Sequence, residues 1–355
     1  MSLVATTTTS DISNTIKTYF DRVLLETLDP TLRFFQFADK KPVPKNEGTS
    51  VRWNRVSRFD LGRILTQGTS MTLSAGRNLS TVAISAIVNQ YGDIVPISDV
   101  ASWASIMDVG KAAVERLGAQ MAETIDRVTA NAIINHVSAA NALGHHLFKT
   151  STELTDYWGM TSTISAGIMT VSSTNVIAVS DVKDSVFKLR SLNVKPYTGN
   201  DYIAIMNTET AADFVGDSQF INFHQYVEKG VDTLYNGELG KVYGCRVVDA
   251  PTGPAMRGSN SGGTASTIAY GTVIFGKGFY GAVDFPEGMN TYIADGASKS
   301  DPLNQITVYG WKANYASKVL NTSAGLTLWC GSKTTTAAYA ESASSGLRHE
   351  DPSTY

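Results

Sequence analysis

Glycines 276, 278 and 281 form the closest match in this sequence to a cofactor-binding motif, Gly-Lys-Gly-Phe-Tyr-Gly. A G-x-G-x-x-G loop holds the pyrophosphate of a dinucleotide when its last glycine opens a helix. Here the chain continues Ala-Val-Asp-Phe-Pro, which is typical of a strand broken by proline. The stretch also nearly matches a phosphate-binding loop, but Gly278 stands where a magnesium-binding Ser or Thr is required. The pattern therefore favours a bend between strands, and a nucleotide-dependent enzyme is the disfavoured alternative.

Other residues capable of chemistry are dispersed along the chain. The five histidines have no metal-ligand spacing, and His145 and His146 are adjacent in an expected loop, as a surface pair. Glu115, Glu123 and Asp126 fall on the expected polar face of a long helix, where solvated charges or ion pairs are the ordinary explanation. No G-x-S-x-G nucleophile motif occurs. We therefore expect no catalytic site, no cofactor and no metal.

Arginine is concentrated in one stretch of the chain. Between Thr49 and Val88 there are five arginines, one acidic residue (Asp60) and no lysine. The five are Arg52, Arg55, Arg58, Arg63 and Arg77. Arginine makes planar, bidentate contacts with carboxylates and tolerates partial desolvation better than lysine. This pattern predicts an arm that pairs with acidic groups of a neighbouring subunit; the alternative is a solvated basic edge that deters aggregation.

The arginines lie in a predicted β-ribbon. Val51 and Trp53 alternate with Arg52 and Asn54, as in a half-buried strand. The same two-residue period continues at Val82, Ile84, Ala86 and Val88, which alternate with Ala83, Ser85 and Ile87. The connection between the two strands, Ser57–Ser80, is far longer than the usual hairpin loop of about two to five residues. An isolated two-stranded ribbon is marginal in water. Because nothing obvious in the same chain would cover it, we expect the ribbon to lie on a second copy.

The first half of the chain is otherwise organised around helices. A capped amphipathic helix is expected from Ser10, followed by a short aromatic helix within Thr31–Asp39 and a linker at Lys41–Gly48. The longest helical pattern runs from Lys111 to Val137 and corresponds to roughly 40 Å of helix. Its apolar face consists of Val114, Leu117, Met121, Ile125, Val128 and Ala132.

The second half predicts an α/β unit. Its expected elements are a helix capped by Ser180, a buried strand at Tyr202–Met206, a helix capped by Asn207, and strands at Arg246–Val248 and Tyr270–Phe275 around a flexible stretch, Pro251–Thr267. Ser138–Asn175 is Ser/Thr/Gly-rich, with a short hairpin as the best interpretation. Asn304–Trp329 is β-like and aromatic and is expected to return to the first unit.

The overall composition fits a chain that buries much of its surface against neighbours. Only 17% of its 355 residues are charged, against roughly 25% in typical soluble domains, and interface centres are depleted in charge. The net charge of -3 does not favour general affinity for nucleic acid or anionic membranes. Cys245 and Cys330 fit free thiols in a reducing compartment, and no secretory signal or membrane span is expected.

Seven short motifs in a fixed order carry a resemblance to a known family. They are Tyr19-Phe20-Asp21-Arg22, Leu65-Thr66-Gln67-Gly68, Gln90-Tyr91-Gly92-Asp93, Thr124-Ile125-Asp126, Asn236-Gly237-Glu238-Leu239-Gly240, Phe275-Gly276-Lys277-Gly278, and Asp301-Pro302-Leu303-Asn304-Gln305 followed by Gly310-Trp311-Lys312. The chain resembles the major capsid proteins of tailed double-stranded DNA bacteriophages, which have the Hong Kong 97-type fold, and within them the N4-like lineage. Gln67 departs from the pattern, because an acidic residue is expected there.

The resemblance implies an α+β capsid fold with five parts. These are an N-terminal arm (1–48), an extended β-ribbon loop (49–89), a peripheral domain with a long spine helix (90–175 and 304–332), an α/β axial domain (176–303) and a flexible C-terminal tail (333–355). The implied function is self-assembly, through pentamers and hexamers, into an icosahedral shell around a double-stranded DNA genome. An encapsulin-like nanocompartment shell is the alternative with the same fold.

The resemblance also implies a set of partners and a location. We expect a portal, a possible decoration protein, packaged double-stranded DNA contacted weakly and non-specifically, and no membrane. Only residues 1–9 precede the first expected helix, so a separate protein is expected to supply scaffolding. The expected location is the virion capsid, assembled in the host cytoplasm.

Overall fold

The computed structural model describes thirteen stretches of the chain. These are residues 32–42, 48–56, 59, 77–105, 108–135, 145–150, 153–156, 174–220, 238–251, 253–259, 265–284, 289–296 and 302–333. The helix expected from Ser10 and the tail beyond residue 333 lie outside them. Within the described residues, no helix is both long enough and apolar enough to cross a membrane.

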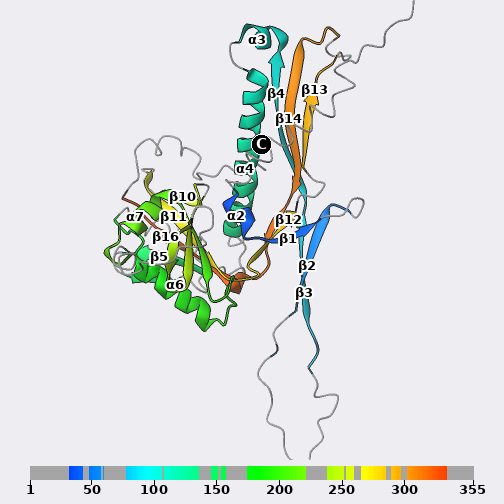
Figure 1. Ribbon diagram of the computed structural model, residues 1–355. Helices are drawn as coiled ribbons and strands as arrows, with labels where there is room; N and C mark the ends of the chain where they lie inside the picture. The colour runs from blue at the N-terminus through cyan, green and yellow to red at the C-terminus, as the bar shows by residue number, and fades with distance from the viewer. Residues whose placement is uncertain are drawn as a thin grey trace, which may run out of the picture.

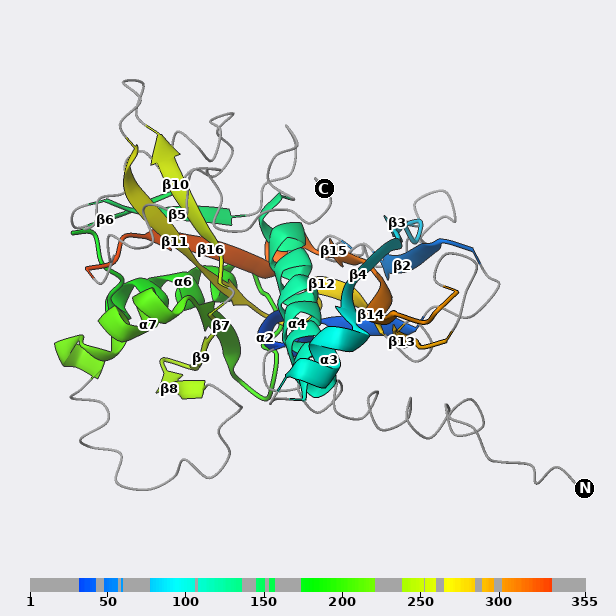
Figure 2. The ribbon, with the colours of Figure 1, turned by 90° about the horizontal axis from the view of Figure 1, so that it is seen from above.

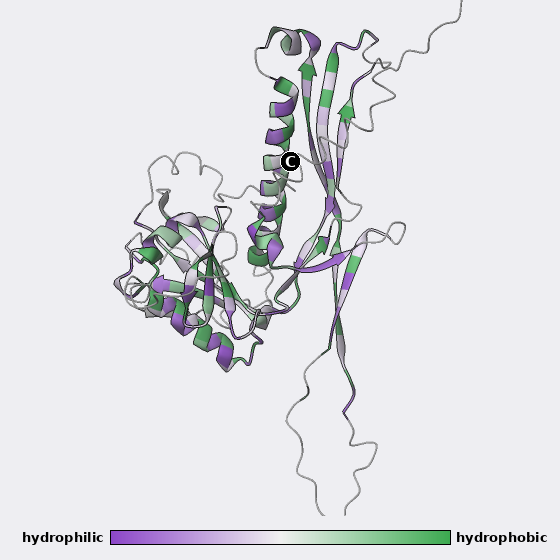
Figure 3. Cartoon of the chain, in the orientation of Figure 1, coloured by the Kyte–Doolittle hydropathy of each residue, from purple (hydrophilic) through white to green (hydrophobic). Residues whose placement is uncertain are grey.

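An α/β unit lies on one side of a long helix, α4, and a three-stranded sheet lies on the other side (Figures 1 and 2). Helix α4 (Val109–Asn135) confirms the longest helical pattern of the sequence. Val114, Leu117, Met121 and Ile125 are buried, whereas Val128 is only partly buried. Hydrophobic and hydrophilic residues alternate along this helix, as Figure 3 shows. An amphipathic helix of this kind is stabilised mainly by packing its apolar face.

The sheet beside α4 has the order β13-β14-β4 and is antiparallel. Its strands are β13 (Met289–Ala294), β14 (Ile306–Tyr315) and β4 (Asn89–Ser98). Strand β14 contacts α4, so this part of the final segment returns to the first unit as expected. A short helix, α3 (Asp99–Ala104), follows β4 at the end of the molecule farthest from the ribbon (Figure 1).

The α/β unit is built on an eight-stranded sheet. Its main path runs β6-β5-β16-β11-β7-β9-β8, and β10 pairs with β11. The strands are β5 (His145–Thr150), β6 (Glu153–Asp156), β7 (Tyr202–Met206), β8 (Glu238–Val242), β9 (Cys245–Asp249), β10 (Ala255–Ser259), β11 (Ala265–Phe275) and β16 (Gly325–Cys330). Two helices, α6 (Val179–Ser191) and α7 (Thr208–Val215), accompany it.

Strand β7 shows how this sheet separates two cores. Tyr202, Ala204 and Met206 pack into the cluster that includes α6 and α7. Ile203 and Ile205 pack into the cluster that includes α4 and a short helix, α2 (Arg33–Gln36). Successive side chains of a strand point to opposite faces. All five residues are buried, so the uninterrupted apolar run of this strand reflects burial on both faces.

Several local expectations differ from the structure. The expected hairpin within Ser138–Asn175 exists as β5 and β6, but it joins the eight-stranded sheet, and so does β16. The linker at Lys41–Gly48 begins inside a strand, β1 (Asp39–Pro42). The stretch Pro251–Thr267 contains β10 and the start of β11. Strands β1 and β16 form through pairing with strands distant in the sequence, which local composition does not indicate, whereas β10 pairs with the next strand, β11.

A small sheet, β1-β12-β15, connects the parts. Strand β1 runs parallel to β12 (Tyr280–Asp284), which also pairs with β15 (Ser317–Val319). A 3-10 turn, η3 (Thr322–Ala324), leads from there into β16. The ribbon, β2 (Ser50–Val56) with β3 (Thr81–Ile87), extends away from this junction as an antiparallel pair (Figure 1).

Candidate assembly surfaces

The base of the ribbon packs on its own chain, which corrects the expectation that nothing there would cover it. Val51 and Ala86 face each other across the two strands, and both are buried. Trp53 packs against the same core, and β3 contacts β15. The fold therefore fixes the direction in which the ribbon leaves the body.

Gly281 makes this docking possible. A β-carbon at this position would lie 3.0 Å from the Cε2 and Nε1 atoms of Trp53 and 3.1 Å from a methyl group of Leu320. Contacts this short force a neighbouring side chain to shift. Because Gly281 has no side chain, the indole of Trp53 can pack directly against strand β12.

Beyond its base the ribbon is exposed. Val56 and Val82 are large apolar residues with exposed side chains, and so are Phe59 and Leu79, which follow β2 and precede β3. Exposed apolar groups in such number on a two-stranded element are costly unless a partner covers them. The outer ribbon is therefore the first candidate assembly surface.

The structure describes three of the five arginines, and all three are exposed: Arg52, Arg55 and Arg77. The Nη1 atom of Arg55 donates a hydrogen bond to Oδ1 of Asn321 in the same chain. The backbone carbonyl of Arg52 accepts a hydrogen bond of 2.5 Å from Nζ of Lys41. Arg58 and Arg63 lie outside the described residues. Arg55 thus helps to hold the ribbon on its own body, a role that the sequence did not indicate.

A second candidate surface is a groove beside α4. It has a volume of about 990 Å³ and lies between the N-terminal half of α4 and strand β4. Val95, Ile97, Ala113 and Leu117 supply its apolar lining, and Asp93 and Arg116 add charge. Such a groove can take an extended or helical segment.

Asp126 anchors the start of the described chain, contrary to its expected place on a solvated face. Its carboxylate is fully buried and accepts hydrogen bonds from the backbone N–H groups of Phe34, at 2.8 Å, and Phe35, at 3.3 Å. These donors belong to the first turn of α2 (Arg33–Gln36), which has no side-chain cap of its own. Tyr280 also donates a hydrogen bond of 2.6 Å to the carbonyl of Phe34. The arm is thereby fixed to α4 and β12.

The other two carboxylates of the helix behave as expected. Glu123 pairs with Arg127, and Glu115 lies 4.0 Å from Lys111, both at i,i+4 spacing. Such exposed pairs contribute little to stability. They are surface ion pairs and not a catalytic acid–base pair.

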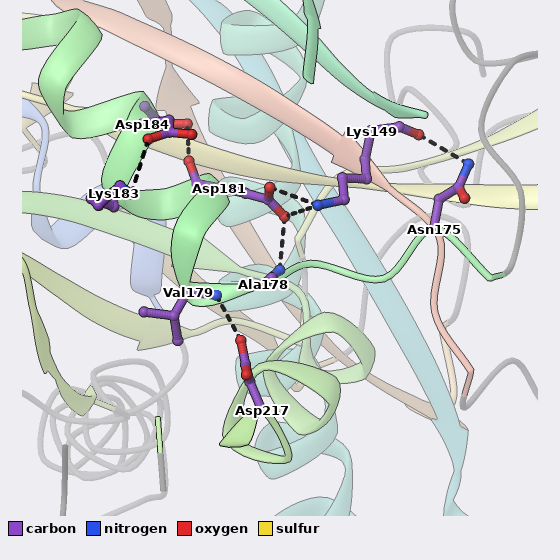
Figure 4. Close-up of polar contacts among 9 residues, drawn as sticks. Lys149, Asn175, Ala178, Val179, Asp181, Lys183, Asp184 and Asp217 are labelled. Atoms are coloured by element: carbon purple, nitrogen blue, oxygen red, sulfur yellow. Dashed lines mark hydrogen bonds and ion pairs between the residues drawn. The ribbon is translucent and has the colours of Figure 1, made fainter. Parts of the chain in front are cut away.

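A buried ion pair holds the β5–β6 hairpin against α6, as Figure 4 shows. Nζ of Lys149 lies 2.7 Å from both carboxylate oxygens of Asp181. Asp181 also accepts a hydrogen bond of 2.8 Å from the backbone N–H of Ala178, at the N-terminus of α6. This interaction, and not the expected Ser180 cap, satisfies that helix end.

His146 and the two cysteines are buried structural groups. His146 lies in β5 and not in a loop, and its Nδ1 atom accepts a hydrogen bond of 2.9 Å from Nε1 of Trp329. Burial raises the pKa of the Cys245 and Cys330 thiols, so neither thiol readily loses its proton to form the nucleophilic thiolate. Within the described residues, no group of three or more His, Cys, Asp or Glu side chains could hold a metal ion.

The glycine motif forms a bend between two strands, as the sequence indicated. Strand β11 ends at Phe275 and β12 begins at Tyr280, so no helix follows the last glycine to receive a phosphate. Gly278 has a φ of +75°, which favours glycine. Gly276 lies directly against the backbone carbonyl of Lys195, so it leaves no room for a side chain.

Comparison with known proteins identifies the fold. No protein-family model matches this chain, and no curated protein matches it. Among solved structures, the capsid of Ralstonia phage GP4 has a TM-score of 0.63 and 12% identity, covering 84% of this chain and 88% of its own. The cyanophage Pam1 capsid has a TM-score of 0.60 and 14% identity, covering 87% of this chain and 93% of its own. This chain has the Hong Kong 97-type capsid fold.

A cellular protein also shares the Hong Kong 97-type fold. The SrpI encapsulin complex from Synechococcus elongatus has a TM-score of 0.51 and 10% identity, covering 84% of this chain and 87% of its own. At these identities the likeness concerns the fold alone. The α+β class and the capsid-type architecture expected from the sequence are confirmed.

Proposed function

We propose that this protein is a major capsid protein, which self-assembles through pentamers and hexamers into an icosahedral shell around a double-stranded DNA phage genome. The main support is the extent of the likeness, because the match with the Pam1 capsid covers 87% of this chain and 93% of that one. The role of the protein is then structural and not enzymatic. The thiols of Cys245 and Cys330 are buried, and no helix follows the last glycine of the Gly276–Gly281 bend. Both observations agree with this proposal.

The proposed parts follow the fold, with two changes to the boundaries. We retain an arm at 1–48, an extended loop at 49–89 and a tail at 333–355. Residues 145–156 and 325–330 are moved from the peripheral to the axial domain, because β5, β6 and β16 belong to the eight-stranded sheet. Residues 289–294 are moved from the axial to the peripheral domain, because β13 pairs with β14. The peripheral domain then consists of α4 with the sheet β13-β14-β4.

The extended loop is the proposed connection between subunits. Its base is held in one direction by Trp53 on Gly281 and by Arg55 on Asn321. Its outer part carries exposed apolar residues and arginines, which are suited to a neighbour with acidic groups. A loop that is already oriented loses less conformational entropy when it binds. Arg52, Arg55, Arg58, Arg63 and Arg77 are the proposed interface residues.

The finer assignments are part of the same proposal. The sequence motifs support the N4-like lineage within the tailed phages. The partners would be copies of this chain, a separate scaffolding protein, a portal and possible decoration proteins, with weak, non-specific contact to the packaged DNA. The protein would belong to the virion capsid and would be assembled in the host cytoplasm.

An encapsulin-like compartment is the second candidate, favoured by the similarity to SrpI. Both candidates predict closed shells, so the contents distinguish them. Nuclease-protected DNA inside native particles supports a phage capsid. A protein cargo without DNA supports a compartment.

Electron microscopy of the purified assembled protein tests the shared core of the proposal. Round shells of uniform diameter with five-fold and quasi-six-fold rings are expected, because a closed icosahedral surface needs both environments. Fibres, or a monomer that forms no particles even in extracts containing the partner proteins, would contradict the proposal.

A further inference from the structure

One end of the α/β unit gathers positive charge. Three segments meet there: the loop that follows α6, the turn between β8 and β9, and the bend between β11 and β12. Residues 185–200, 239–248 and 276–283, which include most of these segments, contain no acidic residue. We call the six cations of these ranges the basic end, and they are Lys188, Arg190, Lys195, Lys241, Arg246 and Lys277.

Backbone contacts bring the three segments of the basic end together. The N–H of Lys277 donates a hydrogen bond of 3.0 Å to the carbonyl of Lys195. A β-carbon at Gly244 would lie 2.7 Å from an Nη atom of Arg190 and 3.6 Å from the carbonyl oxygen of Asn200. The loop after α6 therefore touches both the turn and the bend, and the fold holds the cations of all three segments in one fixed arrangement.

Two carboxylates lie next to the basic end. Asp201 pairs with Lys241 at 2.7 Å and with Arg246 at 3.3 Å. Burial raises the pKa of the Asp39 carboxyl, and the ammonium of Lys277 lowers it by a smaller amount. Six cations thus face two carboxylates, so this end of the α/β unit carries a clear excess of positive charge.

The type of cation at the basic end indicates its ligand. The ribbon has arginine and no lysine between residues 49 and 88, whereas four of the six cations here are lysines. Arginine matches the planar carboxylate of a protein partner, while lysine stays strongly hydrated and contacts phosphate as a point charge. Arg190, Lys195, Lys241 and Lys277 are exposed. Such a surface suits a hydrated chain of phosphates better than the desolvated centre of a protein interface.

The contact is local, because the whole chain has a net charge of -3. At 0.1 M salt the field of a charge cluster extends about 10 Å, so the basic end attracts an anion only at short range. Contacts to phosphates alone carry no sequence information. The basic end therefore suits weak, salt-dependent binding that does not depend on base sequence.

We propose that the basic end binds the phosphate backbone of duplex DNA through Arg190, Lys195, Lys241 and Lys277. The proposal rests on the proposed function, since the duplex is the packaged genome, and it names the surface that contacts this genome. The basic end then faces the interior of the shell. Lys277, from the glycine motif, contributes charge to this surface and does not form a nucleotide pocket.

Fluorescence anisotropy of a labelled, mixed-sequence duplex tests this contact in the unassembled protein. Affinity should fall linearly with salt on logarithmic axes, with a slope of about 0.9 for each phosphate contacted. Lys195→Gln with Lys277→Gln should weaken binding and reduce this slope by about 2. The control, Lys111→Gln with Lys183→Gln, removes two exposed lysines elsewhere and should change neither quantity. Circular dichroism checks that each variant is folded.

Three results of this experiment would overturn the proposal. The first is equal behaviour of the two double variants, and the second is no binding by wild-type protein at about 50 mM salt. The third is tighter binding of polyglutamate than of the duplex, which would assign the basic end to an acidic protein segment.

Acylation of lysines by a small amine-reactive ester tests the same contact in native particles. Lys195 and Lys277 should react more slowly in DNA-filled particles than in particles emptied of DNA, whereas Lys111 should react equally in both. Equal reaction of Lys195 and Lys277 in filled and emptied particles would contradict the assignment of this surface. Particles that contain no DNA, or a protein that forms no particles, would instead contradict the proposed function.

Discussion

The Nζ atom of Lys149 lies 2.7 Å from both carboxylate oxygens of Asp181, and both side chains are buried. Asp181 also holds the N-terminus of α6, so one carboxylate connects the β5–β6 hairpin to a helix that follows about thirty residues later. Burying two charges is favourable only when they satisfy each other. The pair therefore fixes the hairpin to α6, while the pairing of β5 with β16 joins the hairpin to the sheet.

Replacing Lys149 with methionine should destabilise the unassembled chain by about 3–5 kcal/mol, because it leaves a buried carboxylate without its cation. Urea unfolding measures this loss. Lys183→Met is the matched control, since Lys183 forms a more exposed pair with Asp184 at 3.5 Å. The control should change the free energy of unfolding by less than about 1 kcal/mol. Equal effects of the two substitutions would contradict this account.

Asp126→Ala should release α2 from the long helix. The substitution removes a charged acceptor from two backbone N–H groups, and hydrogen bonds to charged groups contribute about 1.5–3 kcal/mol each. We expect faster protease cleavage near residues 32–38 and a lower free energy of unfolding. Glu123→Ala, on the exposed side of the same helix, should leave both unchanged. Cleavage rates that match wild type would show that Asp126 does not hold the arm.

Gly281→Ala should displace Trp53, because the added methyl group would lie 3.0 Å from the indole. The ribbon would then lose its fixed direction, and shell yield should fall while the cores remain folded. Replacing Trp53 with leucine in the same chain should partly relieve the clash, so the two effects should be non-additive. Gly216→Ala is the control, since its nearest neighbour would lie at an ordinary 3.4 Å. Additive effects would mean that the two residues do not interact.

Reversing two ribbon arginines should impair assembly but not folding. A single exposed ion pair contributes only about 0–1 kcal/mol, so Arg55→Glu alone should be mild in its effect on assembly. Arg55→Glu with Arg58→Glu adds repulsion at every subunit contact and should strongly reduce shell yield in sedimentation. High salt should weaken wild-type shells in the same direction, because exposed pairs are screened. Lys111→Glu on α4 serves as a charge-reversal control. Normal shells from the double variant would favour a solvated edge.

Covalent cross-linking through the extended loop should not occur. Some proteins of this fold form lysine–asparagine bonds with a lysine on that loop, whereas no lysine lies between Lys45 and Lys111 here. Denaturing gels of mature particles should show one band near the 38.1 kDa of the chain. A ladder of multimers that survives denaturation and reduction would contradict this prediction.

Local periodicity predicted the elements whose burial pattern is regular. The apolar face of α4, the limits of β7 and the Asn207 cap of α7 are all confirmed. The ribbon was also predictable, because Val51 and Ala86 follow the two-residue period of paired strands.

Long-range pairing was not predictable from the same patterns. The sequence Gly325–Cys330 predicts a buried strand, but its pattern fits the three-stranded sheet beside α4 as well as the eight-stranded sheet. Only its pairing with β11 and β5 places it in the eight-stranded sheet. Asp126 is buried because α2 brings two N–H donors to it from residues 91 and 92 positions away. The one available signal was its position beside Ala122, Thr129 and Ile133, which are also buried on α4. Arg55 similarly binds Asn321, which is distant in sequence.

Cryo-electron microscopy of particles assembled from this chain tests the central claim most directly. We predict closed icosahedral shells in which the ribbon of each subunit, beyond Trp53, lies on a neighbouring copy with its arginines next to acidic side chains. Shells in which every ribbon projects freely into solvent would contradict the assembly role of the arm. Open fibres, or subunits that remain monomeric in the presence of their partner proteins, would contradict the whole account.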